Sequence, residues 1–234
     1  MSSSIVSPTV QIRCKGLLFD MDGILISSLE SVERSWTNWA VLRGIDPVLA
    51  CETAHGCRAV DTLAKLRPDL DPAEEVKIIE DHEMVDTGDV NALPGVLQLL
   101  KTLNENEATR ARWTVVTSAS EKLARVRLAA GGISVPERLV AAEQVSQGKP
   151  HPDPFLAGAA LLGFPPEECV VFEDSSSGAQ AGRAAGCTVV ATTFSHPIDT
   201  LDAAHYLVED VTGIAVSLLP GDEGLLLEFT PLSL

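Results

Sequence analysis

The stretch Leu17-Leu18-Phe19-Asp20-Met21-Asp22-Gly23 decides the fold of this chain. Its apolar run predicts a buried strand, and two carboxylates two residues apart stand at the end of that strand. Since residues i and i+2 of a strand point the same way, Asp20 and Asp22 can face one site. Two buried like charges are costly unless something pairs with them, and a divalent cation suits hard oxygen ligands. One carboxylate could attack a substrate while the other transfers a proton.

Three further runs carry polar residues at comparable places. Val115-Val116-Thr117-Ser118 ends in hydroxyls, Gly148-Lys149-Pro150 holds a lysine in a turn, and Val170-Val171-Phe172-Glu173-Asp174 ends in two acids. After residue 93, short apolar strands alternate with helical segments, which predicts an α/β fold with a parallel sheet and helices on both faces. Ligands of such sheets bind at the carboxyl ends of the strands, so we expect these runs to meet there.

In this order, the four runs resemble the motifs of the haloacid dehalogenase-like hydrolase superfamily, over roughly residues 15–215. The resemblance implies a Rossmann-like parallel-sheet core with an inserted all-helical cap. We expect residues 1–27 and 93–234 to form the core. Residues 28–92 have a helical pattern throughout and no strand pattern, and we expect them to form the cap. Within them, Ser27-x-x-Glu30 has the form of a capping box at the start of the first helix.

The resemblance also implies roles in phosphoryl transfer for the catalytic residues. Asp20 would be the nucleophile that forms an aspartyl-phosphate, and Asp22 would protonate the leaving group and then activate water. Thr117 would hydrogen-bond a phosphoryl oxygen with the help of the Ser118 backbone, and Lys149 would neutralise charge. A non-enzymatic module on this fold would be expected to lose its catalytic carboxylates, which are present here.

The same resemblance implies a magnesium site beside the nucleophile. Mg²⁺ would be held by Asp20, Asp22 and Asp174, and by Glu173 through water. Gly23, next to this set, would contribute to substrate binding. A helix N-cap is the alternative role for the acids that close the third run, but it does not explain a pair of them.

A loop in the expected cap resembles the specificity loop of small sugar- and polyol-phosphate phosphatases. The loop is His55-Gly56-Cys57-Arg58, and the run around it is similar to 2-deoxyglucose-6-phosphate and glycerol-phosphate phosphatases. His55, Gly56 and Arg58 would contact the substrate. The expected function is a magnesium-dependent phosphatase acting on a small phosphorylated sugar or polyol. A β-phosphoglucomutase-like mutase, which shares every catalytic residue, is the alternative.

Composition limits the other classes of function. The net charge of −16 over 234 residues argues against nucleic-acid binding, which needs a basic patch, and against anionic membrane surfaces. It allows a phosphorylated substrate, because a metal and local cations can bind phosphate inside an acidic protein. Five scattered cysteines show neither zinc-site nor disulfide spacing, which fits a reducing cytoplasm. We expect a cytoplasmic monomer without a signal peptide or membrane span.

Overall fold

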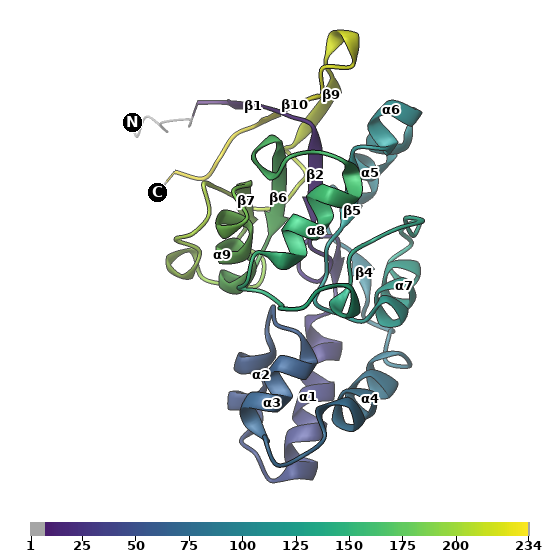
Figure 1. Cartoon of the computed structure of the whole chain (residues 1–234), viewed down its shortest axis with the longest axis vertical. Coiled ribbons are helices and arrows are strands. Elements are labelled where there is room, and N and C mark those ends of the chain that lie inside the picture. Colours follow the sequence, from purple (N-terminus) through teal and green to yellow (C-terminus); the bar gives the residue numbers. More distant parts are fainter. Residues whose placement is uncertain (1–7, 234) are drawn as a thin grey trace, which may run out of the picture.

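The computed structural model describes residues 8–233, and its core is a five-stranded parallel sheet in the order β5–β2–β6–β7–β8 (Figure 1). Phe19 at the end of β2 lies opposite Val115 of β5 and Phe172 of β6. The strands of this sheet are β2 (Gly16–Phe19), β5 (Trp113–Val115), β6 (Cys169–Glu173), β7 (Thr188–Thr192) and β8 (Tyr206–Val208). Because the strands run parallel, the chain segments that follow them begin at one common edge of the sheet.

Helices cover both faces of this sheet, which explains why its central strands are apolar throughout. Along β2, Leu17 and Phe19 belong to one hydrophobic cluster and Leu18 to another. The first cluster includes residues of α5 (Val96–Asn104) and α7 (Glu121–Ala130), and the second includes residues of α8 (Asp153–Leu162) and α9 (Ser176–Ala184). The expected α/β class is confirmed.

Residues 10–19 form two strands that belong to two different sheets. β1 (Val10–Cys14) pairs antiparallel with β10 (Leu225–Phe229), which pairs with β9 (Ala215–Leu218). β1 has a mixed, half-exposed pattern, whereas β2 is buried at every position. Val140 makes an isolated parallel bridge with Val116, beyond the end of β5.

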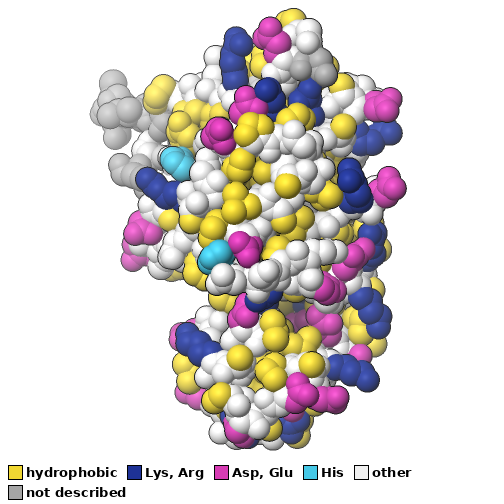
Figure 2. Space-filling view, in the orientation of Figure 1, with side chains coloured by type: hydrophobic (Ala, Val, Ile, Leu, Met, Phe, Trp, Pro, Cys, Tyr) yellow, Lys and Arg dark blue, Asp and Glu magenta, His cyan; other side chains and the backbone are white. Residues whose placement is uncertain are grey.

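The segment between β2 and α5 forms four helices with a hydrophobic cluster of their own, hereafter the helical insertion. They are α1 (Leu29–Arg43), α2 (Pro47–Ala54), α3 (Ala59–Leu66) and α4 (Pro72–Glu83). In Figure 1 they lie together below the core, and Figure 2 shows a narrow waist between the two parts with charged side chains around it. Trp39 is buried in this cluster, and its indole N–H donates to Glu75.

A two-stranded antiparallel ribbon joins the insertion to the core. β3 (Ile26–Ser27) pairs with β4 (Asn91–Ala92), with Ile26 opposite Ala92. The expectation of no strand in 28–92 is therefore wrong at its last two residues, because a strand of this length is too short to show an alternating pattern. The domain boundaries at 27/28 and 92/93 stay a prediction.

Short elements complete the described chain, in which no helix is both long and apolar enough to cross a membrane. They are α6 (Glu107–Arg110) and the 3₁₀ turns η1 (Ala142–Gln144), η2 (Pro166–Glu168), η3 (Ile198–Thr200) and η4 (Pro220–Asp222).

Candidate active site

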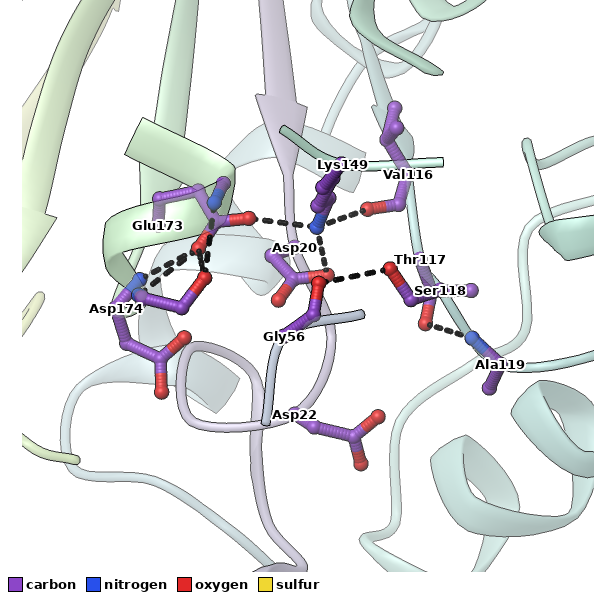
Figure 3. Close-up of polar contacts among 12 residues, drawn as sticks. Asp20, Asp22, Gly56, Val116, Thr117, Ser118, Ala119, Lys149, Glu173 and Asp174 are labelled. Atoms are coloured by element: carbon purple, nitrogen blue, oxygen red, sulfur yellow. Dashed lines mark hydrogen bonds and ion pairs between the residues drawn. The ribbon is translucent and has the colours of Figure 1, made fainter. Parts of the chain in front are cut away.

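Three buried carboxylates meet where β2 and β6 end. Asp20 follows β2 directly, Glu173 is the last residue of β6, and Asp174 comes next. Each of the three can present a ligand atom within 4.8 Å of the others. This juxtaposition results from the parallel register of the two strands, and Figure 3 shows the carboxylates around the end of β2.

Lys149 lies between two of these acids. Its Nζ is 2.8 Å from Oδ1 of Asp20 and 2.6 Å from Oε1 of Glu173, and it donates to the carbonyl of Val116 at 3.4 Å. Burial alone would lower the pKa of Lys149, but the two carboxylates outweigh burial and raise that pKa. Lys149 is therefore a charged group held against the candidate nucleophile.

Glu173 uses both of its carboxylate oxygens within the protein. Oε1 accepts from Lys149, and Oε2 accepts from the backbone N–H groups of Asp174 and Ser175, each at 3.0 Å, and from the Ser175 hydroxyl at 2.9 Å. Its contacts therefore position Lys149 and hold the start of α9. The expected role of Glu173 as a water-mediated metal ligand stays a prediction, and Glu173 belongs to the candidate metal cluster.

The electrostatics of the cluster favour a bound cation. Burial, together with neighbouring carboxylates, raises the pKa of Asp174 well above its ordinary value. Burial also raises the pKa of Asp20, although Lys149 opposes this shift. Three acids face one lysine, so ionising all of them leaves an excess of buried negative charge. Carboxylate oxygens are the ligands that Mg²⁺ takes, and Asp20 and Asp174 fit such an ion.

The carboxylate of Asp22 lies apart from this cluster, although Asp20 and Asp22 line the same cavity. It accepts from the Ser28 hydroxyl and, at 3.2 Å, from Nη1 of Arg127. Figure 3 shows Asp22 turned away from Asp20. The alternation of a strand does not extend to Asp22, because β2 ends at Phe19. The predicted capping box Ser27-x-x-Glu30 is wrong, because the N-cap of α1 is Ser28 and its side chain makes no cap hydrogen bond.

Gly23 leaves room for Asp174. Its φ is +79°, and a Cβ at this position would lie 1.7 Å from Oδ2 of Asp174. An L side chain would thus be strained by the backbone and would also displace the carboxylate. Gly23 is not among the residues that line the cavity shared by Asp20 and Asp22.

A cavity of about 320 Å³ opens between the carboxylates and the helical insertion. Of the residues expected to bind substrate, His55, Gly56 and Ser118 line it, as does the expected catalytic residue Thr117. Ser118 also donates its hydroxyl to the carbonyl of Gly56 at 3.1 Å, which joins the core to the loop of the insertion (Figure 3). The rest of the lining is Asp20, Asp22, Leu29, Val32, Glu33, Trp36, Cys51, Glu52, Ala54, Cys57, Ala59, Glu80, Glu83, Ala119, Leu123, Arg127 and Asp174.

Arg58 lies outside this lining. Its guanidinium binds Asp61 through Nε at 2.7 Å and Nη2 at 2.9 Å, and it donates to backbone carbonyls of the core, among them Val145 at 2.9 Å and Ser146 at 3.2 Å. The expectation that Arg58 contacts the substrate does not agree with these contacts. They make Arg58 a link between the insertion and the loop that precedes Lys149.

Two residues near the site had no signal in the sequence. His196 packs against His55 with ring centroids 4.3 Å apart, and burial and His196 together lower the pKa of His55. Arg127 of α7 is buried between Asp22 and Glu83. A lone histidine in a loop and an arginine in an amphipathic helix are both ordinarily exposed, so only the fold reveals them.

With the fold and the site established, comparison with known proteins identifies the class. The model of haloacid dehalogenase-like hydrolases matches residues 14–186, and the chain belongs to this family. It is 39% identical to hexitol phosphatase A of Escherichia coli over 90% of this chain and 98% of that protein. It is 33% identical to glycerol-1-phosphate phosphohydrolase 2 of Saccharomyces cerevisiae over 81% and 80% of the two chains.

Among solved structures, the fold is similar to a β-phosphoglucomutase from Clostridium difficile. The TM-score is 0.68 at 23% identity, covering 85% of this chain and 92% of that one. The expected fold family is confirmed, and so is the expected class of enzyme, a phosphatase of this family.

Proposed function

We infer that this protein is a magnesium-dependent phosphatase that hydrolyses a small phosphorylated sugar or polyol through an aspartyl-phosphate. The observation that carries this proposal is Asp20, buried at the floor of the cavity and paired with Lys149 at 2.8 Å. Relatives named as hexitol and glycerol-phosphate phosphatases, which match most of the chain, support the substrate class.

In the first half-reaction, an Asp20 oxygen attacks phosphorus, and the bond from phosphorus to the substrate oxygen breaks. Lys149 neutralises negative charge beside Asp20, and Thr117 offers its hydroxyl to a phosphoryl oxygen. Asp22 gives its proton to the leaving alkoxide, which departs as an alcohol. A bound Mg²⁺, held by Asp20 and Asp174, supplies further charge neutralisation at the phosphoryl group.

In the second half-reaction, Asp22 takes a proton from water, and the water oxygen attacks the phosphorus of the aspartyl-phosphate. The products are inorganic phosphate and a regenerated Asp20 carboxylate. In this proposal Asp22, which lines the same cavity as Asp20, serves first as the acid for the leaving group and then as the base for the attacking water.

The helical insertion acts as a cap over this chemistry in our proposal. His55 and Gly56 would contact the substrate, and residues 28–92 would form the cap on a core of residues 1–27 and 93–234. Arg58 would hold the cap against the core. A cytoplasmic monomer stays a prediction.

A phosphate-release assay over phosphorylated sugars and polyols tests the proposal. We expect turnover of at least one such monoester with Mg²⁺, none in excess chelator, and recovery when Mg²⁺ is restored. Activity that persists in excess chelator would show that the phosphatase does not depend on Mg²⁺. Isomerised sugar phosphate without released phosphate would establish the mutase instead.

A further inference from the structure

The helical insertion forms one wall of the cavity, and this wall is acidic. It contributes Glu33 from α1, Glu52 from α2, and Glu80 and Glu83 from α4. Within the described part of the chain, the insertion contributes neither lysine nor arginine to this lining. The core contributes Arg127, so one guanidinium faces four glutamates.

Arg127 has guanidinium N–H groups that do not hydrogen-bond to the described residues. Its side chain is 3% exposed, its Nη1 donates to Asp22 at 3.2 Å, and its Nη2 lies 3.4 Å from Oε1 of Glu83. Its Nε and Nη2 make no hydrogen bond to any residue in 8–233. Buried donors in native proteins are nearly always satisfied, and a cavity-lining guanidinium with open N–H groups calls for an acceptor on a ligand.

The charges of Arg127 and the four glutamates limit which hydrogen-bond acceptor the ligand can carry. A second phosphate or a carboxylate would meet one arginine already paired with two acids, and it would lie among four glutamates. Glu83 is buried and Glu80 is half-buried, whereas Glu33 and Glu52 are exposed, so repulsion of a second negative charge is strongest beside Arg127. A hydroxyl accepts from Arg127 and also donates to a glutamate oxygen, so it satisfies both partners without adding charge.

From this complementarity we propose that the part of the substrate remote from its phosphate is an uncharged, hydroxylated chain, read by Arg127 and Glu83. The acidic wall rejects bisphosphates and phosphorylated acids. This inference rests on the phosphatase function proposed above and narrows its substrates to monophosphates of neutral sugars or alditols. It also opposes the mutase, whose activating bisphosphate would place its second phosphate on this wall.

Two matched substrates test the inference. Sorbitol 6-phosphate and 6-phosphogluconate differ only at C1, where a hydroxymethyl group replaces a carboxylate, and p-nitrophenyl phosphate has no hydroxylated chain. We expect the wild type to prefer the alditol over the acid by about 100-fold in kcat/KM, as repulsion by the wall requires. Equal use of the two substrates would overturn the inference.

At pH 8, above the raised pKa of Glu83, Glu83→Gln removes one charge from the wall while keeping its size. We expect the preference for the alditol to narrow by about tenfold, which is about 1.4 kcal/mol, with a change under about threefold on p-nitrophenyl phosphate. Glu74→Gln, at an exposed position of the same helix outside the cavity, is the control. An unchanged preference in Glu83→Gln would contradict the proposal. If that variant does not fold, the preference for the alditol is measured in Glu80→Gln instead, with the same expected narrowing.

Arg127→Met tests whether Arg127 binds the hydroxylated part of the substrate, separately from any effect on the chemical step. We expect KM for sorbitol 6-phosphate to rise by about tenfold relative to KM for p-nitrophenyl phosphate, with partial rescue in Arg127→Lys. The comparison is made in KM because p-nitrophenolate leaves without the proton that an alkoxide needs, so a kcat loss through Asp22 would differ between the two substrates. An equal change in KM on both would show that Arg127 does not read the chain. Failure of the wild type on all three esters would reject the proposed function itself.

Discussion

The ammonium of Lys149 lies 2.6 Å from the carboxylate of Glu173, a residue with no exposed surface. The same ammonium contacts Asp20, so Glu173 aims Lys149 at the candidate nucleophile. Because Glu173 also accepts from the first backbone N–H groups around α9, its position is fixed by the helix and not by solvent. The fold therefore orients Lys149, the candidate catalytic lysine, through its ion pair with Glu173.

Lys149→Met should destabilise the protein and abolish its activity. The variant leaves two buried carboxylates without their cation, which costs about 3–5 kcal/mol in unfolding free energy. Urea unfolding at pH 7 in chelator measures this loss, and it should shrink at pH 5, because burial raises the pKa of Asp20 and a protonated Asp20 needs no cation. Lys101→Met, at an exposed position of α5, is the control. A loss as small as that of the control would mean that the ion pairs contribute nothing net.

Asp20→Asn should stop turnover and leave the fold intact. The change is nearly isosteric and removes the oxygen anion that attacks phosphorus, so phosphate release should fall by at least about 10³-fold. Circular dichroism and the melting temperature check the fold. A folded Asp20→Asn variant, shown by mass to retain the amide, that releases phosphate at a near-normal rate would exclude Asp20 as nucleophile.

Gly23→Ala should weaken metal binding more than its backbone strain explains. The new methyl group would lie 1.7 Å from Oδ2 of Asp174, so this carboxylate must move. We expect the Mg²⁺ concentration for half-maximal activity to rise by about tenfold or more, as when a ligand's support is lost. Gly44→Ala shares the positive φ, at +67°, but its Cβ meets nothing within 4 Å. If both variants need the same Mg²⁺ concentration, the contact has no bearing on the metal.

Glu83→Gln should make stability less dependent on pH. Burial raises the pKa of Glu83 from its ordinary 4.5 to about 7, although Arg127 opposes the shift. Between these values the folded state holds a proton that the unfolded chain has released, so stability falls as pH rises. For this residue alone, the fall is of order 3 kcal/mol at most.

Urea unfolding at pH 5 and pH 8 measures this dependence. Stability should decline less between the two pH values in Glu83→Gln than in the wild type and in Glu74→Gln, whose side chain is exposed. Equal declines in all three proteins would show that Glu83 ionises in the folded state as freely as in the unfolded chain.

The core could be predicted because its strands are short, apolar and separated by helical periodicity. The run Leu17-Leu18-Phe19 is buried on both faces, and the acids after β2 and β6 meet because parallel strands end at one edge. The division between β1 and β2 was not predictable. It depends on pairing with β10, which lies near the other end of the chain.

Side-chain partners could not be predicted in the same way. Ser28 could have capped α1, but it donates to Asp22 instead, because the turn after β2 brings the two together. Arg58 could have pointed into the cavity, but it binds Asp61 and core carbonyls. Arg127 becomes a buried cation only when α4 packs near α7 and brings Glu83 to it. Each outcome depends on contacts between distant segments.

The ribbon of β3 and β4 makes the helical insertion, in topological terms, the loop of a β-hairpin. Ile26 and Ala92 are register partners, so the chain leaves the core and returns to it at the same point. Antiparallel strands can be joined by as few as about two residues, and the entropy of closing a longer loop grows only slowly with its length. The core therefore places little constraint on what fills the loop. The segment 28–90 can thus change while Asp20, Glu173 and Asp174 stay where the parallel sheet holds them.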